Sequence, residues 1–193
     1  PWTPWEDLAI IYYLHLGVKE DRQITTIIHN HQAETWHLTS GELYELAREN
    51  TPKLCPCTTG RLDHLLFGWD EDEDRMVPCD TGLPTLYVLS NRTGINGAIC
   101  MLYDNVIKDF ADTLGSDLII LPSSIHEVLI LPDSHDETYE KFRNMVRSVN
   151  AEDVPKEEVL SDELYLYRRG SSGVIRWKSS DSDNADKCGT ENL

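Results

Sequence analysis

The spacing of apolar positions changes along the chain, and each change predicts a different element. Residues 8–16 and 23–31 are rich in β-branched and aromatic side chains, and a polar stretch, 17–22, separates them. This pattern is typical of a strand, a turn and a second strand that pairs with the first. A β-hairpin is therefore expected near the N-terminus.

Thr39 and Glu42 have the spacing of a capping box, in which each side chain bonds the other residue's backbone amide at the start of a helix. Apolar positions then recur at helical spacing, whereas proline disfavours helical conformation in the residue before it. The sequence therefore predicts a helix that ends before Pro52. Three of its side chains are expected to face inward: Leu43, Leu46 and Ala47.

The clearest periodicity lies in the second half of the chain. Residues 86–90 predict a strand, a glycine-containing turn follows at 91–98, and apolar positions then recur every three or four residues as far as Gly115. Gly115 is placed to end this helix, because glycine adopts the left-handed conformation of a C-cap without strain. The residues expected on the apolar helix face are Ile99, Leu102, Val106, Ile107, Phe110 and Leu114.

Two strands are expected next, at 117–121 and 125–131. The second has apolar residues on both of its faces, which is typical of a central strand covered on both sides. A further capping box, at 134–137, predicts the last helix, and 163–169 with 173–177 predict a closing hairpin. The inward side of that helix is expected to carry Tyr139, Phe142, Met145, Val146 and Val149.

In this order the elements predict an α+β fold with a mixed or mainly antiparallel sheet and about three amphipathic helices, arranged ββα-βαββα-ββ. The pattern also predicts four segments. A ββα subdomain over 1–51 and a main βαββαββ unit over 85–177 are separated by an irregular acidic loop, 52–84. A polar, flexible tail over 178–193 is expected to follow.

Charge and composition narrow the classes of partner. The 193 residues include 34 acidic and 17 basic side chains, a net charge of -17, which repels a nucleic-acid backbone. No apolar run approaches the roughly 20 residues that span a bilayer, and no secretion signal is recognisable. Five cysteines, an odd number, favour reduced thiols. A cytoplasmic protein is expected, with no nucleic-acid or membrane partner.

Two groups of side chains have the chemistry of metal ligands. The first lacks the paired spacing of a structural zinc site, so no cofactor is expected there: Cys55, Cys57, His64 and Cys79. In the second, His29 and His31 would project from one face of the predicted strand, and His37 could follow as a third ligand. Because no carboxylate lies at a recognisable spacing, a polar edge face of the strand is the favoured interpretation of these histidines.

The densest polar cluster joins the two strands expected at 117–121 and 125–131: Ser123, Ser124, His126 and Glu127. A hydrolase could use His126 with either serine as nucleophile and Glu127 as a polar support. However, Ser124 and His126 would share one strand face while Glu127 points away, and the G-x-S-x-G elbow is absent. A tight connection whose hydroxyls bond local amides is the favoured alternative.

A second candidate site is the turn that contains Arg92, Gly94 and Gly97 before a helix. Free amides at a helix N-terminus bind phosphate or carboxylate groups, and Arg92 would add positive charge. The turn lacks the Lys-Ser/Thr of a P-loop and the third glycine of a dinucleotide fingerprint. Glycines that serve a tight turn with positive φ are therefore the favoured interpretation.

Four stretches carry a resemblance to a known family: PWTPWEDLAIIYYL, GELYELARENTPKL, YVLSNRTGINGAICMLYDNVIKDFADTLGSDLIILPSSIHEVLILPD and VLSDELYLYRR. They resemble domain of unknown function 5688, an uncharacterised bacterial family of anaerobic gut bacteria. The likeness covers about 1–169, and 87–133 is its most specific part. It implies a cytosolic α+β protein that lacks the family's further N-terminal segment. Because the family brings no activity, it transfers no catalytic residue.

The favoured hypothesis is a non-catalytic binding or interaction module whose partner is an unidentified protein or small molecule. A hydrolase that uses His126 and a metal-binding protein that uses His29, His31 and His37 are the alternatives. A cavity shared by the Gly94 turn and the Ser123 turn would favour the enzyme.

Overall fold

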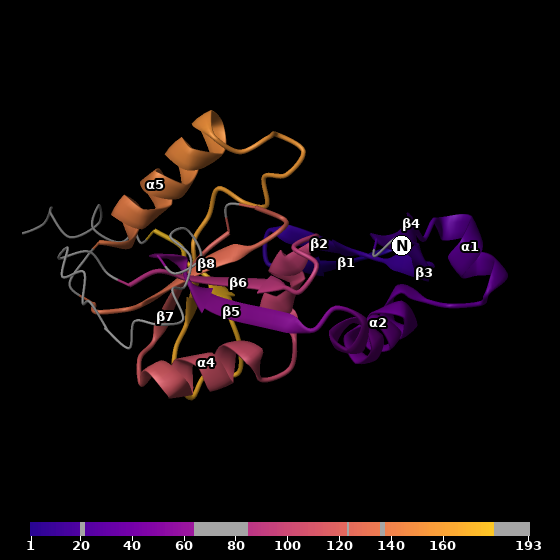
Figure 1. Ribbon diagram of the computed structural model, residues 1–193, viewed down its shortest axis with the longest axis horizontal. Coiled ribbons are helices and arrows are strands. Elements are labelled where there is room, and N and C mark those ends of the chain that lie inside the picture. Colours follow the sequence, from indigo (N-terminus) through magenta and orange to yellow (C-terminus); the bar gives the residue numbers. More distant parts are fainter. Residues whose placement is uncertain (20–21, 64–84, 123, 136–137, 180–193) are drawn as a thin grey trace, which may run out of the picture.

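The structure, a computed structural model, describes five stretches of the chain: 1–19, 22–63, 85–122, 124–135 and 138–179. Figure 1 shows two regions, which we call the arm and the body. The arm contains β1 (Trp2–Trp5), β2 (Leu8–Ile11), β3 (Tyr13–Lys19), β4 (Arg22–Ile27), α1 (Asn30–Thr35) and α2 (Ser40–Leu54). The body contains β5 (Cys57–Arg61), β6 (Tyr87–Asn91), the 3-10 helix η1 (Gly97–Leu102), α4 (Val106–Leu114), β7 (Leu118–Leu121), β8 (Val128–Pro132), α5 (Tyr139–Glu152), β9 (Tyr165–Tyr167) and β10 (Ile175–Arg176).

The body is built on a six-stranded sheet with the order β10-β9-β7-β8-β6-β5, and every pairing in it is antiparallel. Helices α4 and α5 lie on opposite sides of this sheet (Figure 1). The predicted α+β fold with a mainly antiparallel sheet is therefore confirmed. No helix in the described part of the chain is both long and apolar enough to cross a membrane.

Strand β8 is covered on both faces, as its apolar pattern predicts. Val128 and Ile130 belong to the cluster that includes residues of α4 and η1. Leu131 belongs to the cluster that includes Phe142 and Val146 of α5. Burial of one such side chain stabilises the fold by roughly 1.5–3 kcal/mol. Because β8 buries side chains on both of its faces, the packing of the body is centred on this strand.

The helix expected to run up to Gly115 is interrupted, which corrects that prediction. Asn105 has a φ of 62° and separates η1 from α4, although both elements pack on the same cluster. Arg48 on α2 holds the intervening turn, because its Nε and Nη2 atoms donate to the two carboxylate oxygens of Asp104 at 3.0 Å. The end of the helix is as predicted, with Gly115 at a φ of 69°.

Helix α2 begins at the predicted capping box, but its end and its buried face differ from the prediction. The Thr39 hydroxyl accepts from the Glu42 amide at 3.2 Å, and Glu42 accepts from the Thr39 amide at 2.8 Å. The helix continues through Pro52, and the Cys55 amide donates to the Thr51 carbonyl at 2.8 Å. Leu43 is buried and Ala47 packs against it, whereas Leu46 is exposed.

Helix α5 presents a narrower apolar stripe than its sequence pattern predicts. Phe142 and Val146, one turn apart, are buried against the sheet, and Tyr139 packs beside them. Met145 and Val149 are exposed, because the helix contacts the body along one side only. The helix begins after Thr138, and residues 136–137 of the expected capping box lie outside the described residues.

The arm pairs its strands differently from the predicted hairpin. The stretch expected as one strand is divided at Tyr12: β2 pairs with β1, and β3 pairs with β4. The sequence pattern overlooked β1, whose Pro4 lies opposite Ala9 in a two-stranded ladder, a position that tolerates proline. His31 lies in α1 rather than in a strand.

The tip of the β1–β2 hairpin connects the arm to the body. The Trp5 ring lies 5.2 Å from the Tyr165 ring, measured between centroids. Asp7 accepts from the Tyr165 hydroxyl and from the Ser161 hydroxyl, both at 2.7 Å. The core of the arm is a small buried cluster that consists of Tyr12, Ile28, Ala33 of α1 and Leu43 of α2.

The division of the chain at 1–51, 52–84, 85–177 and 178–193 stays a prediction. The described part of the stretch expected as an irregular loop includes one regular element, because β5 lies in it and pairs with β6. Residues 64–84 of that stretch and residues 180–193 of the tail lie outside the described residues.

Candidate functional site

The cluster around Ser124 forms a connection before β8, so the strand geometry assumed for it is wrong. Ser124 is buried and pairs with Val159 in an isolated bridge, and the Ile125 amide donates to the Glu158 carbonyl at 2.8 Å. The Ser124 hydroxyl accepts from the His126 amide at 3.0 Å. This hydroxyl is therefore bonded to local backbone, and Ser123 lies outside the described residues.

The His126 imidazole has a partner at each nitrogen. Its Nδ1 atom accepts from the Asn96 amide at 3.2 Å, and its Nε2 atom lies 3.7 Å from Glu158 Oε1. Because Nδ1 accepts, a neutral ring carries its proton on Nε2, which faces the Glu158 carboxylate. Glu127 has no side-chain hydrogen bond or ion pair within the described stretches. The acid beside His126 is thus Glu158, which the sequence analysis did not select.

The turn that contains Arg92 and Gly94 is held by one buried side chain, Asn91. The Asn91 carbonyl oxygen accepts from the amide and the hydroxyl of Thr93 at 2.9 and 2.7 Å. Its amide nitrogen donates to the Ile95 carbonyl at 2.8 Å. Gly94 has a φ of +67°, as the tight-turn interpretation predicts, and the exposed Arg92 makes no side-chain bond to another described residue.

Gly97 lets this turn approach the Ser124 connection closely. A Cβ atom at Gly97 would lie 2.2 Å from Ser90 Oγ and 2.4 Å from the His126 carbonyl oxygen. The Ala98 amide donates to the Ile125 carbonyl at 3.2 Å. The two turns therefore meet by direct backbone contact, and the amides of Asn96 and Ala98 already have acceptors. The turn also precedes the six-residue 3-10 helix η1 rather than an α-helix, so an anion would find few free donors.

The three histidines proposed as metal ligands do not share a strand face. His29 is the N-cap residue of α1, His31 lies within α1, and their rings stack with centroids 5.8 Å apart. His37 follows the helix with a φ of 55°. Over the stretches that the structure describes, no three or more His, Cys, Asp or Glu side chains are placed to hold a metal ion.

The cysteines are only partly described, because Cys79 lies outside the described residues, as does His64. Cys55 and Cys57 are half-buried thiols, and Cys100 is fully buried. Burial raises the pKa of the Cys100 thiol to about 12. This thiol is therefore protonated at neutral pH and is a poor nucleophile.

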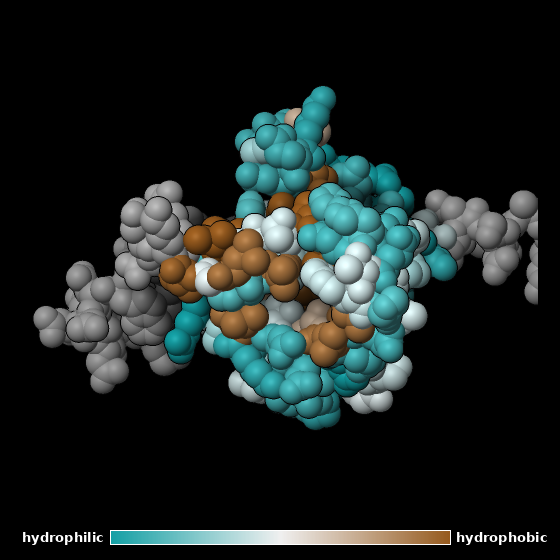
Figure 2. Space-filling model, turned by 90° about the vertical axis from the view of Figure 1, so that its right-hand side faces the viewer, coloured by the Kyte–Doolittle hydropathy of each residue, from teal (hydrophilic) through white to brown (hydrophobic). Residues whose placement is uncertain are grey.

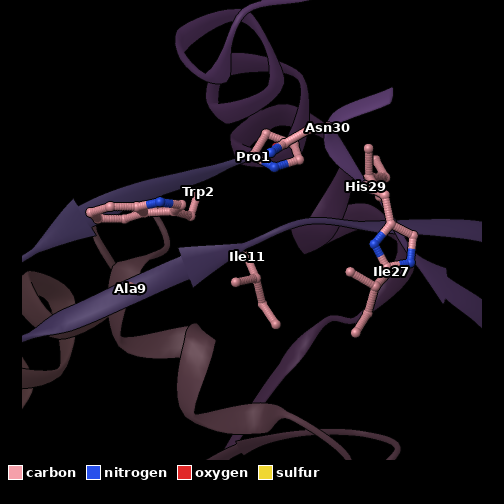
Figure 3. Close-up of a pocket in the computed structure, with 8 residues that line it drawn as sticks. Pro1, Trp2, Ala9, Ile11, Ile27, His29 and Asn30 are labelled. Atoms are coloured by element: carbon pink, nitrogen blue, oxygen red, sulfur yellow. The ribbon is translucent and has the colours of Figure 1, made fainter. Parts of the chain in front are cut away.

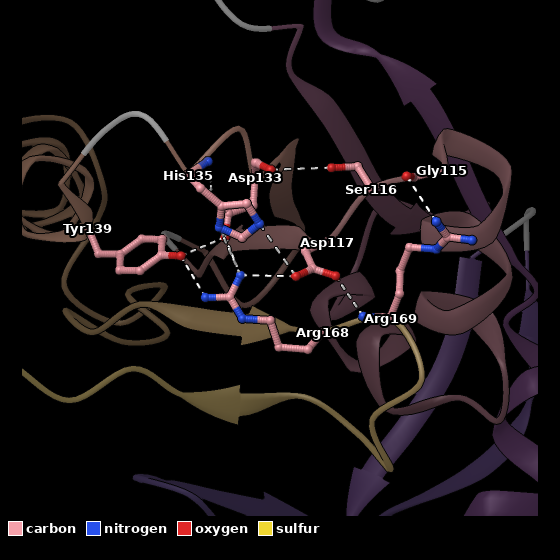
Figure 4. A network of polar contacts seen from close by, with 8 residues as sticks. All are labelled: Gly115, Ser116, Asp117, Asp133, His135, Tyr139, Arg168 and Arg169. Atoms are coloured by element: carbon pink, nitrogen blue, oxygen red, sulfur yellow. Dashed lines mark hydrogen bonds and ion pairs between the residues drawn. The ribbon is translucent and has the colours of Figure 1, made fainter.

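A polar network at one end of the body sheet was missed by the sequence analysis (Figure 4). Its centre is Asp133, which accepts from the Tyr139 hydroxyl at 2.7 Å and from Arg168 Nη1 at 2.5 Å. Arg168 also donates to Asp117 Oδ2 at 3.1 Å, and the His135 ring lies 3.3 Å from Asp133 Oδ2. Asp133 follows β8, Arg168 follows β9 and Asp117 precedes β7, so the pairing of these strands brings the three residues together.

The electrostatics of this network favour charged carboxylates. Burial would raise the pKa of Asp133, whose side chain is 1% exposed, but bonds from Tyr139, the His135 amide and Arg168 lower that pKa below its ordinary value. The Arg169 amide lowers the pKa of Asp117 in the same direction. Because Asp133, Tyr139 and Arg168 satisfy one another, the network stabilises this end of the sheet.

The arm has a pocket of about 510 Å³ over its two hairpins (Figure 3). The residues around it come from β1, β2 and the end of β4 with the segment that follows: Pro1, Trp2, Ala9, Ile11, Ile27, Ile28, His29 and Asn30. None of these side chains belongs to an acid, a lysine or an arginine. The pocket is therefore lined mainly by apolar groups.

The pocket lies on one apolar face of the arm, which we call the outer face and define by Trp2, Ala9, Ile11, Tyr13 and Ile27. Trp2 lies opposite Ile11, and Tyr13 lies opposite Ile27, so each pair projects to one side of its ladder. The exposed fractions of Trp2, Ile11, Tyr13 and Ile27 are 58%, 48%, 44% and 41%. Figure 2 views the molecule from the side of the arm and shows that apolar side chains gather on that side.

The distribution of charged residues along the sequence contains a signal for the outer face. Residues 8–18 and 23–33 contain no acidic residue, lysine or arginine, although 26% of the chain is charged. The apolar pattern of the same runs predicts strands only. The sequence alone does not say how many strands pair with one another. It therefore does not distinguish a strand that is buried on one face from a strand that is buried on both faces.

A protein-family model matches the chain from the arm to just past the end of β9. This model, described as Family of unknown function (DUF5688), matches residues 1–169. The chain belongs to this family. The family description carries no activity, substrate or partner, so it leaves the function of both turns and of the outer face open. No curated protein and no solved structure is significantly similar to the chain.

Proposed function

We propose that this chain is a non-catalytic binding module whose binding site is the outer face of the arm. The observation that carries the proposal is the pocket of about 510 Å³ on an exposed face without charged side chains. Pockets that bind ligands are mostly apolar and enclose about 300–1,000 Å³, and this pocket has a volume in that range but is open to solvent. Contiguous apolar surface on a folded protein marks an interaction site.

The polar candidates support the proposal by contrast. The Ser124 hydroxyl and the amides of Asn96 and Ala98 are bonded within the two turns, and Asp133 is bonded within its own network. A reactive or anion-binding site needs donors or acceptors that a ligand can reach. The outer face instead exposes apolar side chains, and their burial by a partner is favourable.

The test uses Nile red, an uncharged dye whose fluorescence rises in apolar sites, titrated against the protein at low protein concentration. Ile11→Asp and Ile27→Asp place a charge on the outer face and are expected to weaken saturable dye binding about tenfold or more. Ile175→Asp is the matched control, since Ile175 is similarly exposed but lies on β10 of the body. Equal dye binding by all four proteins would refute the proposal.

A hydrolase remains the rival function, and one observation gives it substance. The Nε2 atom of His126 lies 3.7 Å from the Glu158 carboxylate, so a charged partner could support the ring as a base. We expect no turnover when the protein is screened against esters, phosphoesters and peptides. Robust turnover that His126→Ala abolishes would establish the enzyme and remove the non-catalytic proposal.

A further inference from the structure

We infer that the partner of the outer face is a second copy of this chain, so that two copies pack through their arms. This inference rests on the proposed function, because it names the occupant of the same surface. Closed two-fold dimers use one self-complementary patch twice. The outer face suits such use, because it combines a pocket with exposed apolar side chains, among them Trp2, which itself lines the pocket.

The distribution of charge favours a second copy over a basic or polar partner. The chain carries a net charge of -17, so a symmetric contact between most of its surfaces would oppose acidic groups to acidic groups. The outer face avoids this, because its own side chains are apolar and the runs 8–18 and 23–33, which supply most of it, contain no acidic residue, lysine or arginine. A basic partner would instead be recognised through acidic side chains on the contact face, and this face has none.

The position of the arm reduces the remaining repulsion. Figure 1 shows the arm extending to one side of the body, and of the 20 acidic residues that the structure describes, 14 lie in the body. Charges on exposed surfaces are screened over about 8 Å at physiological salt. Two copies that meet through their arms therefore keep their bodies apart, and added salt is expected to strengthen their association.

The strand pairing of the arm leaves room for a partner. Strands β1 and β2 form one two-stranded ladder, and β3 and β4 form another. An isolated two-stranded hairpin is marginally stable in water and has an unpaired edge on each side. A second copy on the outer face would cover one side of both ladders.

The exposed apolar area is of the size that a stable dimer needs. The four large side chains of the outer face, Trp2, Ile11, Tyr13 and Ile27, are 41% to 58% exposed. If each presents roughly 200 Å² when fully exposed, the outer face offers on the order of 400 Å² of apolar side-chain area. A standard interface buries about 800 Å² on each partner, of which a little over half is non-polar. Affinities for interfaces of that size range from micromolar to picomolar, and the weak end of this range sets the concentrations to be searched.

The experiment is sedimentation velocity over protein concentrations from about 1 to 100 µM, the range in which a weak interface of this size dissociates. The chain is expected to move from its monomer mass of 22.1 kDa to twice that mass as concentration rises. Ile11→Asp and Ile27→Asp are expected to raise the dissociation constant about tenfold or more, whereas Ile175→Asp is expected to leave it unchanged. Circular dichroism checks that each variant is folded.

Hydrogen exchange of the wild-type chain locates the contact without any substitution. Amides of residues 8–28 are expected to exchange more slowly at 100 µM than at 1 µM, both concentrations being about those of the sedimentation series. A chain that stays monomeric, or that dimerises with no added protection there, would overturn the inference.

Dye binding separates failure of this inference from failure of the proposed function. In a dimer through the outer face, Nile red bound per chain falls as protein concentration rises. A monomer that still binds the dye at the outer face keeps the proposed function but refutes the second copy as its partner. A monomer that binds no dye refutes both.

Discussion

The arm and the body use the same antiparallel pairing, but they differ in how many faces of their strands are covered. In the body, β8 has α4 and η1 on one side and α5 on the other, and it pairs with two strands. In the arm, β2 has one partner strand and an exposed outer face. Similar apolar residues therefore stabilise the fold in one region and remain available for contact in the other.

The largest expected effect is a cavity at the centre of the body. Ile130→Ala in β8 is expected to lower the free energy of unfolding by about 3–4 kcal/mol, because the fully buried side chain leaves a void between two packed layers. Ile27→Ala on the outer face is expected to cost less than about 1 kcal/mol. Urea denaturation at low protein concentration measures both. Equal losses would break the comparison.

The contact between the two turns of the body is the next test. Gly97→Ala is expected to cost about 3 kcal/mol, because the added Cβ would lie within 2.7 Å of two backbone atoms and must displace them. Gly94→Ala is the matched variant, with a φ of +67° but nothing within 4 Å of the added carbon. Its cost is expected to be about 1 kcal/mol, from the left-handed conformation alone. Chemical denaturation separates the two, and a smaller loss for Gly97→Ala would contradict the close approach.

The polar network at the sheet end should make stability depend on pH. Asp133→Asn is expected to lower the free energy of unfolding at pH 7 by about 2 kcal/mol, since Arg168 loses a buried charged partner. The pKa of Asp133 is lowered by folding, so its contribution is complete above the unfolded pKa of about 3.9 and is lost as pH falls further.

Unfolding measured between about pH 2.5 and 7 checks this, because the loss on acidification should be smaller in Asp133→Asn than in the wild type. Asp109→Asn is the control. Its side chain is 73% exposed, so a change within about 0.5 kcal/mol is expected at every pH. An Asp133→Asn variant with the acid sensitivity of the wild type would show that another group carries it.

The smallest expected effect lies in the arm. Leu16→Thr replaces a largely exposed side chain at the irregular point of the β3–β4 ladder. The free energy of unfolding of the monomer is expected to change by no more than about 0.5 kcal/mol. Thermal unfolding at low protein concentration measures it. A loss comparable to that of Ile130→Ala would mean that the arm is packed as tightly as the body.

Much of the body could be predicted because its signals are local. The two-sided pattern of β8, the Thr39 capping box and the Gly115 C-cap all follow from residues within a few positions of one another. The break at Asn105 could not be predicted in this way. At this break Asp104 bonds Arg48, a residue 56 positions away in the sequence, and a local pattern contains no such contact.

The candidate sites show the same difference between local signals and contacts between distant residues. The glycine turn was expected, and Gly94 adopts the predicted positive φ. The partner of His126 was not, because Glu158 is brought beside it by the bond between Ile125 and the Glu158 carbonyl. Catalytic roles for Ser123, Ser124, His126 and Glu127 stay predictions, and so do ligand roles for Arg92, Gly94 and Gly97.

The sequence by itself determined the fold class, the family and which positions of each strand and helix are apolar, because these depend on periodicity and on short motifs. Only the tertiary structure decided which strands pair, and therefore which apolar faces are covered. An isoleucine has the same side chain in β2 and in β8, but the first meets solvent and the second meets a helix. That difference depends on contacts between residues far apart in the chain, which a local pattern does not contain.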